Sequence, residues 1–188
     1  EANRWGFPRS FTIYDRDDQI AVIRKALKEL GHKAEGPFAP GKVLGIIGRA
    51  KNGGVPPEEI RSQVFGPDAP VYEDLYRQYN RRLHDAGAFD FDDLLLKPVE
   101  MFGVDAVALR RWQNRFSYVL VDEYQDTNRV QFRLVKLLCG DSGNITVVGD
   151  DDQSIYSWRG ADIKNILDFE REFSGVKIVK LEQNYRST

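Results

Sequence analysis

The residues with the clearest chemical potential are two adjacent carboxylates, Asp122 and Glu123, which directly follow the apolar run 118–121. A hard cation such as Mg²⁺ prefers oxygen ligands and keeps several waters, so one carboxylate and the phosphates of a nucleotide can complete its coordination. The neighbouring carboxylate can orient an attacking water and accept its proton. Two solvated acids at the end of a strand look the same in sequence, so this pair alone does not distinguish the two interpretations.

A second pattern combines aromatic and cationic side chains in residues 153–160. Tyr156 and Trp158 are two positions apart, and Arg159 follows directly. Aromatic faces beside a guanidinium are typical of surfaces that bind single-stranded nucleic acid, because every base offers a π-face for stacking. The alternative is that both rings pack in the core, and the aromatic pair alone favours that alternative.

The elements that must position these residues alternate between strand and helix. Short apolar runs at 118–121, 145–148 and 176–181 predict strands, and the spacing of apolar residues predicts helices at 129–139 and 162–173. The run at 118–121 is continuous, as expected of a strand buried on both faces. This order indicates an α/β fold with a parallel sheet.

Each predicted strand is followed by a polar cluster, which begins at Asp122, Gly149 or Glu182. The carboxyl ends of parallel strands meet at one edge of a sheet, where ligands of open α/β sheets bind. The sequence therefore predicts that Asp122 lies near Gln153 and Arg186 at a common site.

The first half of the chain has a different, mainly helical texture. Asp15 or Asp17 can cap a helix that ends near Gly31, and a longer helix is predicted over 69–86. Glycine and proline are frequent in 33–57, which predicts loops around a short apolar run. The longer helix carries a basic cluster that is either a solvated face or a contact for nucleic acid: Arg77, Arg81, Arg82 and His84.

Two further helices are expected between these halves. Asp90 can cap a helix that begins at Phe91 and is kinked or ended by Pro98, and another helix is expected over 105–115, which contains Trp112.

Composition narrows the class of protein. The 188 residues carry a formal net charge of −2, so a basic signature of nucleic-acid binding is absent from the chain as a whole. The single cysteine, Cys139, excludes a disulfide within the chain and argues against a cysteine-based zinc site. Neither a signal peptide nor an apolar run of membrane-spanning length is present, so we expect a cytoplasmic protein without a membrane partner.

Three blocks, 121–128, 148–161 and 181–188, resemble helicase motifs of the UvrD/Rep/PcrA group of bacterial superfamily 1 DNA helicases, in the right order. The similarity extends over the chain and includes residues 11–15 and 89–94. It implies a partial RecA-like parallel sheet with helices and an inserted all-helical subdomain.

The same resemblance implies domain boundaries: a connector at 1–11, the helical subdomain at 12–88, and the later part of the motor domain at 89–188. It also implies ATP and Mg²⁺ as cofactors, single-stranded DNA and single/double-strand junctions as partners, and 3′ to 5′ movement that separates a duplex. The roles it implies are metal binding by Asp122, catalysis by Glu123, ATP binding by Gln125, Gln153, Tyr185 and Arg186, and DNA binding by Tyr156, Trp158 and Arg159.

One part of the family pattern is absent, namely the phosphate loop. Residues 48–55 have its glycine spacing but lack its lysine and hydroxyl residue, so we interpret them as an ordinary loop. We therefore expect a piece of a longer protein that hydrolyses ATP negligibly by itself. Two other classes stay open: a metal-dependent nuclease that uses Asp122, Glu123 and the acids at 150–152, and a non-catalytic DNA-binding or interaction module.

Overall fold

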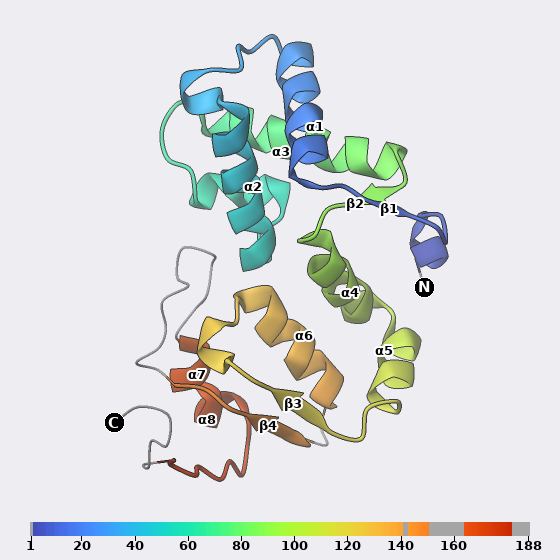
Figure 1. The fold of residues 1–188 in the computed structure, drawn as a ribbon, viewed down its shortest axis with the longest axis vertical. Coiled ribbons are helices and arrows are strands. Elements are labelled where there is room, and N and C mark those ends of the chain that lie inside the picture. Colours follow the sequence, from blue (N-terminus) through green and yellow to red (C-terminus); the bar gives the residue numbers. More distant parts are fainter. Residues whose placement is uncertain (1, 141–142, 151–163, 182–188) are drawn as a thin grey trace.

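The computed structural model describes residues 2–140, 143–150 and 164–181. Helices dominate, and the short strands form two separate parallel pairs (Figure 1). This arrangement confirms the predicted α/β class. None of the helices in the described ranges is both long and apolar enough to cross a membrane.

Three helices build the first half of the molecule. Asp15 begins the first of them as predicted: its carboxylate accepts hydrogen bonds from the backbone of Asp17 and Asp18, and Asp18 returns the contact in a capping box. Two short 3-10 helices, η2 (Gly36–Phe38) and η3 (Pro57–Ser62), connect the longer ones. The three helices are α1 (Arg16–Glu29), α2 (Pro40–Gly53) and α3 (Ala69–Asp85).

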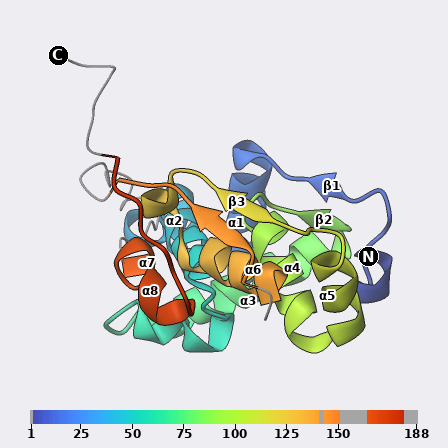
Figure 2. The ribbon, with the colours of Figure 1, turned by 90° about the horizontal axis from the view of Figure 1, so that it is seen from below.

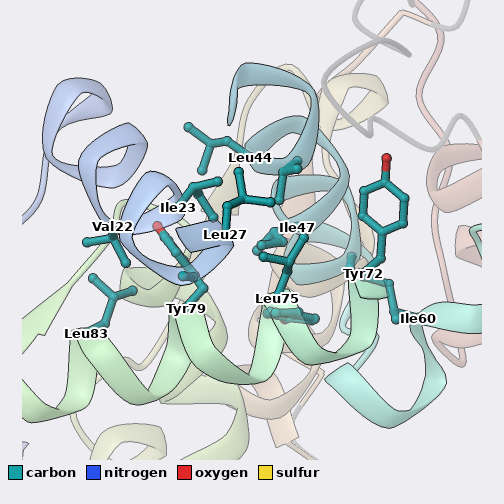
Figure 3. Packing of buried hydrophobic residues seen from close by; sticks show 14 of the residues in the cluster. Val22, Ile23, Leu27, Leu44, Ile47, Ile60, Tyr72, Leu75, Tyr79 and Leu83 are labelled. Carbon is teal, nitrogen blue, oxygen red and sulfur yellow. The ribbon is translucent and has the colours of Figure 1, made fainter. Parts of the chain in front are cut away.

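The side chains between these helices form the largest core of the protein. Leu27 from α1, Ile47 from α2 and Leu75 from α3 point toward one another and are almost fully buried (Figure 3). Tyr79 and Leu83 continue the buried face of α3, as the spacing of apolar residues predicts. Burial of this many apolar groups is the main contribution to the stability of the helical half, which comprises α1, α2 and α3.

The prediction of loops over 33–57 is wrong, because α2 occupies the middle of this range. Pro40 lies at the first helical position, where its missing N–H costs nothing, and Gly54 ends the helix in the left-handed conformation at φ 67°. Val43, Ile47 and Ala50 share one buried face. This tertiary burial outweighs the low helix propensity of the glycines. Residues 48–53 are therefore helical, which corrects their interpretation as a loop.

The two ends of the helical half lie side by side. Strand β1 (Thr12–Ile13) pairs in parallel with β2 (Ala88–Phe89), and the N-terminal turn η1 (Ala2–Trp5) precedes them. Phe7 and Phe11 pack against the Phe89 ring, with centroid distances of 4.1 and 4.8 Å. The chain thus enters and leaves the helical half at one place.

Helices α4 (Asp93–Val104) and α5 (Ala106–Gln113) follow β2. Helix α4 begins two residues later than predicted, because Asp90 lies before a turn and its carboxylate accepts from Asp93 N at 2.8 Å. Of the two outcomes expected at Pro98, a kink or an end of the helix, the end is wrong, because α4 continues to Val104. Buried Leu96, Val99 and Phe102 on the flanking turns hold the helix across the lost backbone hydrogen bond.

The second strand pair is β3 (Val119–Val121) and β4 (Ile145–Val147), which are parallel in the register Val119↔Ile145, and α6 (Arg129–Cys139) connects them. Helix α6 packs against one face of this pair (Figure 2). Leu120 on the other face is 74% exposed. The prediction that this strand is buried on both faces is therefore wrong for the described residues, because only one layer of helices covers it.

The last part of the chain departs most from the prediction. The helix expected over 162–173 is two short helices within the described residues, α7 (Lys164–Leu167) and α8 (Phe169–Glu172), which are interrupted at Asp168. Residues 176–181 do not form the predicted third strand. An apolar run becomes a strand only when a neighbouring strand completes its hydrogen bonds, and none of the described strands pairs with residues 176–181.

Candidate nucleotide site at the strand ends

The parallel register brings the first two predicted polar clusters together. Val148 N donates to Val121 O at 2.8 Å, and Tyr124 N donates to Val148 O at 3.0 Å. The segment that follows β3 therefore lies directly beside the segment that follows β4. The predicted meeting of strand ends is confirmed for these two clusters.

Gln125 connects the two strand ends through its side chain, which is 1% exposed. Its Nε2 donates to Glu123 Oε2 at 2.8 Å, and its Oε1 accepts from Asp150 N at 3.0 Å. Gly149 makes this approach possible, because a Cβ there would lie only 2.7 Å from Gln125 Oε1. A buried amide with both ends occupied holds a fixed orientation.

Asp122 and Glu123 present exposed carboxylates at the mouth of this junction. Asp122 Oδ1 accepts from Glu123 N at 2.9 Å. Glu123 has φ 50°, a left-handed conformation that costs a residue other than glycine about 1–3 kcal/mol. Backbone strain of this kind is common at functional sites, and here it turns the chain sharply after β3, where both acidic residues stay exposed.

The back of the same loop is anchored by buried groups. Thr127 Oγ1 donates to Tyr124 O at 2.7 Å, and Asn165 Nδ2 donates to Thr127 O at 2.9 Å. The Tyr124 ring meets Phe169 edge to face at 5.5 Å, and burial raises the pKa of Tyr124 to about 12. Tyr124 therefore stays neutral at physiological pH and acts as packing.

The front of the loop opens into a pocket of about 390 Å³, whose lining includes Asp122, Glu123, Asp126 and Gln131. Asp126 Oδ1 is buried and accepts no hydrogen bond within the described part of the chain. Carboxylate oxygens that converge on one pocket suit a hard cation such as Mg²⁺. In the described ranges no three potential ligands converge tightly enough to hold a metal by themselves, so phosphate oxygens and waters would complete the coordination.

The remaining predicted site residues lie outside the described residues: Gln153, Tyr156, Trp158, Arg159, Tyr185 and Arg186. The expected third strand end at Glu182 lies there as well. Two structural contributors were missed by sequence reasoning, namely Asp126, whose Oδ1 has no hydrogen-bond partner among the described residues, and Asn165, which anchors the loop. Asp126 could have been found from its place after Asp122, whereas the contact of Asn165 has no signature in the sequence.

The basic cluster on α3 turns out to be matched with acids. Arg77 contacts Glu73 at 2.9 Å, and Arg82 pairs with Glu29 of α1. Arg81 lies 3.7 Å from Asp85. Since each arginine has an acidic neighbour, the structure favours the solvated-face interpretation over a contact for nucleic acid.

The fold and the site define an α/β protein in which a parallel strand pair presents adjacent carboxylates at its carboxyl end and a helical unit precedes it. The family description "UvrD/REP helicase N-terminal domain" matches residues 1–174. The chain belongs to this family.

Known proteins agree with this assignment over the whole chain. The ATP-dependent DNA helicase PcrA of Bacillus subtilis is 44% identical over 188 residues, and that of Staphylococcus epidermidis is also 44% identical. The PcrA helicase of Staphylococcus aureus is 43% identical over the same length. The chain covers 100% of its own length in these comparisons but only 25–26% of each relative.

Proposed function

We propose that this chain is part of an ATP-dependent DNA helicase and carries the half of its nucleotide site that acts on Mg²⁺ and water. Asp122 holds the cation, and Glu123 orients the attacking water and accepts its proton. Membership of the UvrD/REP family and the likeness to PcrA helicases support this proposal. The bound Mg²⁺ would neutralise charge that develops on the transferred phosphoryl group.

The observation that carries the proposal is the bridge made by Gln125. This side chain ties the Glu123 carboxylate to the backbone at Asp150, which belongs to the polar cluster that precedes residues 153–160 in the sequence. A change in the bound nucleotide could therefore act through Gln125 on the chain that leads to Tyr156 and Trp158. Coupling of ATP hydrolysis to movement on DNA requires such a link between two sites.

The proposal extends to the site residues outside the described ranges. Gln153, Tyr185 and Arg186 would bind ATP, and Tyr156, Trp158 and Arg159 would bind single-stranded DNA or single/double-strand junctions. Movement would run 3′ to 5′, in the cytoplasm. The isolated chain would hydrolyse ATP negligibly, because the phosphate-binding lysine and amides are absent from its sequence.

A chimera tests the catalytic role. The 188 residues that match in the Bacillus subtilis relative are replaced by this chain, and DNA-stimulated ATP hydrolysis is measured for the chimera and its Glu123→Gln variant. We expect the variant to lose roughly 100-fold or more in kcat, the contribution typical of a general base. A fully active Glu123→Gln chimera would overturn the proposal.

The isolated chain tests the DNA-binding role. Fluorescence anisotropy of a labelled oligo-dT strand is measured at low and moderate salt for the chain and for Trp158→Ala. Stacking contributes about 1–3 kcal/mol per base, so we expect a loss of tenfold or more in affinity. Magnesium-dependent cleavage of the same strand, abolished by Asp122→Asn, would favour the nuclease alternative instead.

A further inference from the structure

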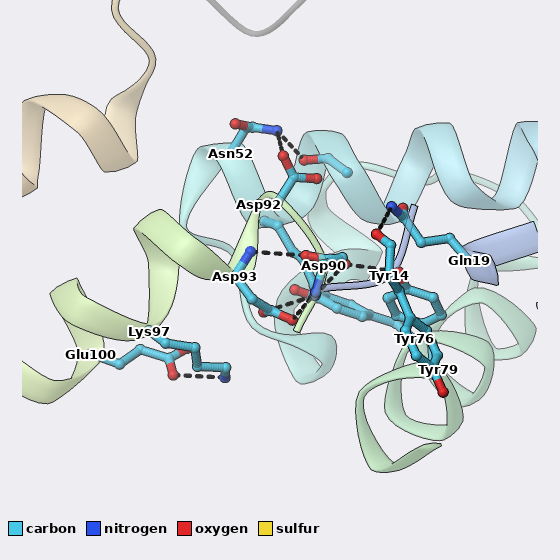
Figure 4. A network of polar contacts seen from close by, with 12 residues as sticks. Tyr14, Gln19, Asn52, Tyr76, Tyr79, Asp90, Asp92, Asp93, Lys97 and Glu100 are labelled. Carbon is cyan, nitrogen blue, oxygen red and sulfur yellow. Dashed lines mark hydrogen bonds and ion pairs between the residues drawn. The ribbon is translucent and has the colours of Figure 1, made fainter. Parts of the chain in front are cut away.

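The last turn of α2 makes an unusual contact between the helical half and the loop of the candidate site. Asn52 uses every polar atom of its side chain. Its Nδ2 donates to Gly48 O at 2.8 Å and to Asp92 Oδ1 at 3.0 Å, and its Oδ1 accepts from Asn128 Nδ2 at 2.6 Å. Figure 4 shows Asn52 directed at Asp92. One side chain of the helical half thus joins the starts of both α4 and α6.

The neighbouring residue fixes this turn from the buried side. Lys51 is 1% exposed, and its Nζ lies 2.7 Å from Asp90 Oδ2 and 2.8 Å from Asp93 Oδ1. Tyr79 of α3 donates to the same Asp90 oxygen at 2.8 Å. A buried cation held by two carboxylates leaves the last turn of α2 little freedom, so Asn52 is presented to the loop in one orientation.

Asn128 carries the contact into the loop of the candidate site. Its Oδ1 accepts from Gln131 N at 2.9 Å, and Gln131 Oε1 accepts from Asn128 N at 2.9 Å, which closes a capping box at the start of α6. Asn128 lies two residues after Asp126. A rotation of the Asn128 side chain would break either the cap or the contact with Asn52.

We propose that Asn52 is a positioning residue, which sets the loop 122–128 against the helical half through Asn128. Asparagine suits this role because a short side chain must donate toward Asp92 and accept from Asn128 at once. Aspartate lacks the donor, and alanine lacks both groups. The consequence for catalysis rests on the proposed function, since the loop carries Asp122 and Glu123.

Hydrogen exchange in the 188-residue chain tests the contact without any nucleotide. The amides of Tyr124, Asp126, Thr127 and Phe132 donate to backbone carbonyls and report the order of the loop and of the first turn of α6. We expect Asn52→Ala to speed their exchange roughly threefold to tenfold, the range for loss of one hydrogen bond. Unchanged exchange of these amides in Asn52→Ala would overturn the proposal.

A charge exchange separates positioning from a loss of stability. Asn52→Asp places a second carboxylate beside Asp92 and should speed exchange at least as much as Asn52→Ala. In Asn52→Asp/Asp92→Asn the carboxylate at position 52 accepts from both amides but cannot donate to Gly48 O, so exchange should be slower than in Asn52→Asp yet faster than in the original chain. Failure of this rescue, with the double variant still folded, would contradict the assigned contacts.

A matched control destabilises the helical half without touching Asn128. Leu44 is buried in the same helix, so Leu44→Ala should lower the midpoint of unfolding yet leave exchange in 124–132 unchanged under native conditions. If Leu44→Ala speeds exchange there as much as Asn52→Ala does, the specific role of Asn52 is refuted.

Failure of this inference and failure of the proposed function give different results. Normal exchange in Asn52→Ala would remove the positioning role, whatever the Glu123→Gln chimera does. An active Glu123→Gln chimera would remove the proposed chemistry, while rescue of exchange by the double variant would still establish the contact. When both tests succeed, Asn52→Ala in the chimera should lower kcat for ATP hydrolysis more than it changes KM, and the double variant should recover part of the kcat that Asn52→Asp loses.

Discussion

The helical half and the α/β half, which contains β3, α6 and β4, bury their apolar side chains to different extents. Helices α1, α2 and α3 enclose a continuous core in which Ile23, Val43 and Leu75 are completely buried. The strand pair β3–β4 has a helical layer on one face, and Leu120 and Val148 stay exposed. A three-helix unit can bury its apolar faces within itself, whereas a two-stranded sheet needs further layers for its second face.

The polar groups of the two halves differ in the same way. In the buried ion cluster that joins the two halves, Lys51 lies between the carboxylates of Asp90 and Asp93. The candidate site keeps exposed carboxylates at Asp122 and Glu123 and a strained backbone at the second of them. The helical half thus pairs its buried charges with one another, whereas the candidate site keeps its carboxylates exposed to solvent.

The largest effect should come from the cluster that joins the halves. Lys51→Ala leaves two buried carboxylates without their cation, so we expect the free energy of unfolding to fall by about 3–5 kcal/mol. Urea unfolding followed by circular dichroism measures the change. Lys97→Ala is the control, because its partly exposed pair with Glu100 should contribute only about 0–1 kcal/mol. Equal losses in the two variants would show that the buried cluster stabilises the fold no more than a partly exposed ion pair does.

The next effect tests the difference in burial directly. Leu75 is completely buried in the helical half, so Leu75→Ala should cost about 2–5 kcal/mol. Leu120 is 74% exposed on β3, so Leu120→Ala should stay within about 0.5 kcal/mol. Thermal unfolding of both variants provides the comparison. A loss at Leu120 as large as that at Leu75 would mean that the exposed face of β3 is covered in solution.

A smaller effect compares the two capping boxes. Asp15 caps α1 in the helical half, and Asn128 caps α6 in the α/β half. Removal of a cap costs about 1 kcal/mol, so Asp15→Ala should be destabilising by that amount. Asn128→Ala should cost more, because it also loses the hydrogen bond to Asn52. Urea midpoints in the opposite order would argue that the contact between the halves is not formed.

The smallest effect is a dependence on pH. Burial and the nearby Asp90 raise the pKa of Asp93 above its usual 3.8, although Lys51 opposes the shift. A raised pKa in the folded state means that this stability is present below the unfolded pKa and is lost as pH rises through the folded pKa. The original chain should therefore exceed Asp93→Asn in stability most at low pH, with the difference shrinking toward neutrality. If the stability advantage of the original chain over Asp93→Asn instead grows as pH rises, the pKa of Asp93 is not raised in the folded state.

Several elements could be predicted because their signals are local. The helices α1 and α3 follow from a cap at Asp15, from apolar residues at helical spacing and from the stop near Gly31. The pair Asp122 and Glu123 after an apolar run predicted a site at the end of β3. Helix α2 was not predicted because its four glycines and Pro40 resemble a loop, and burial against α1 and α3 makes it helical.

Other features depend on contacts that spacing along the chain does not record. The expected strand over 176–181 is absent because a strand requires a neighbour, and the neighbour is not specified by the run itself. The bridge from Gln125 to Asp150 and the contact from Asn52 to Asn128 join residues that are 25 and 76 positions apart. Neither distance has a periodicity that a pattern could reveal.

The sequence by itself determined the class of fold, the helices with strong caps and the carboxylates of the candidate site, because hydrophobic periodicity, capping and motif chemistry act over a few residues. The tertiary structure alone decided that α2 is a helix, that one face of β3 stays open, and that Lys51 and Asn52 join the two halves. These outcomes depend on burial and on hydrogen bonds between distant segments, and such contacts exist only once the chain has folded.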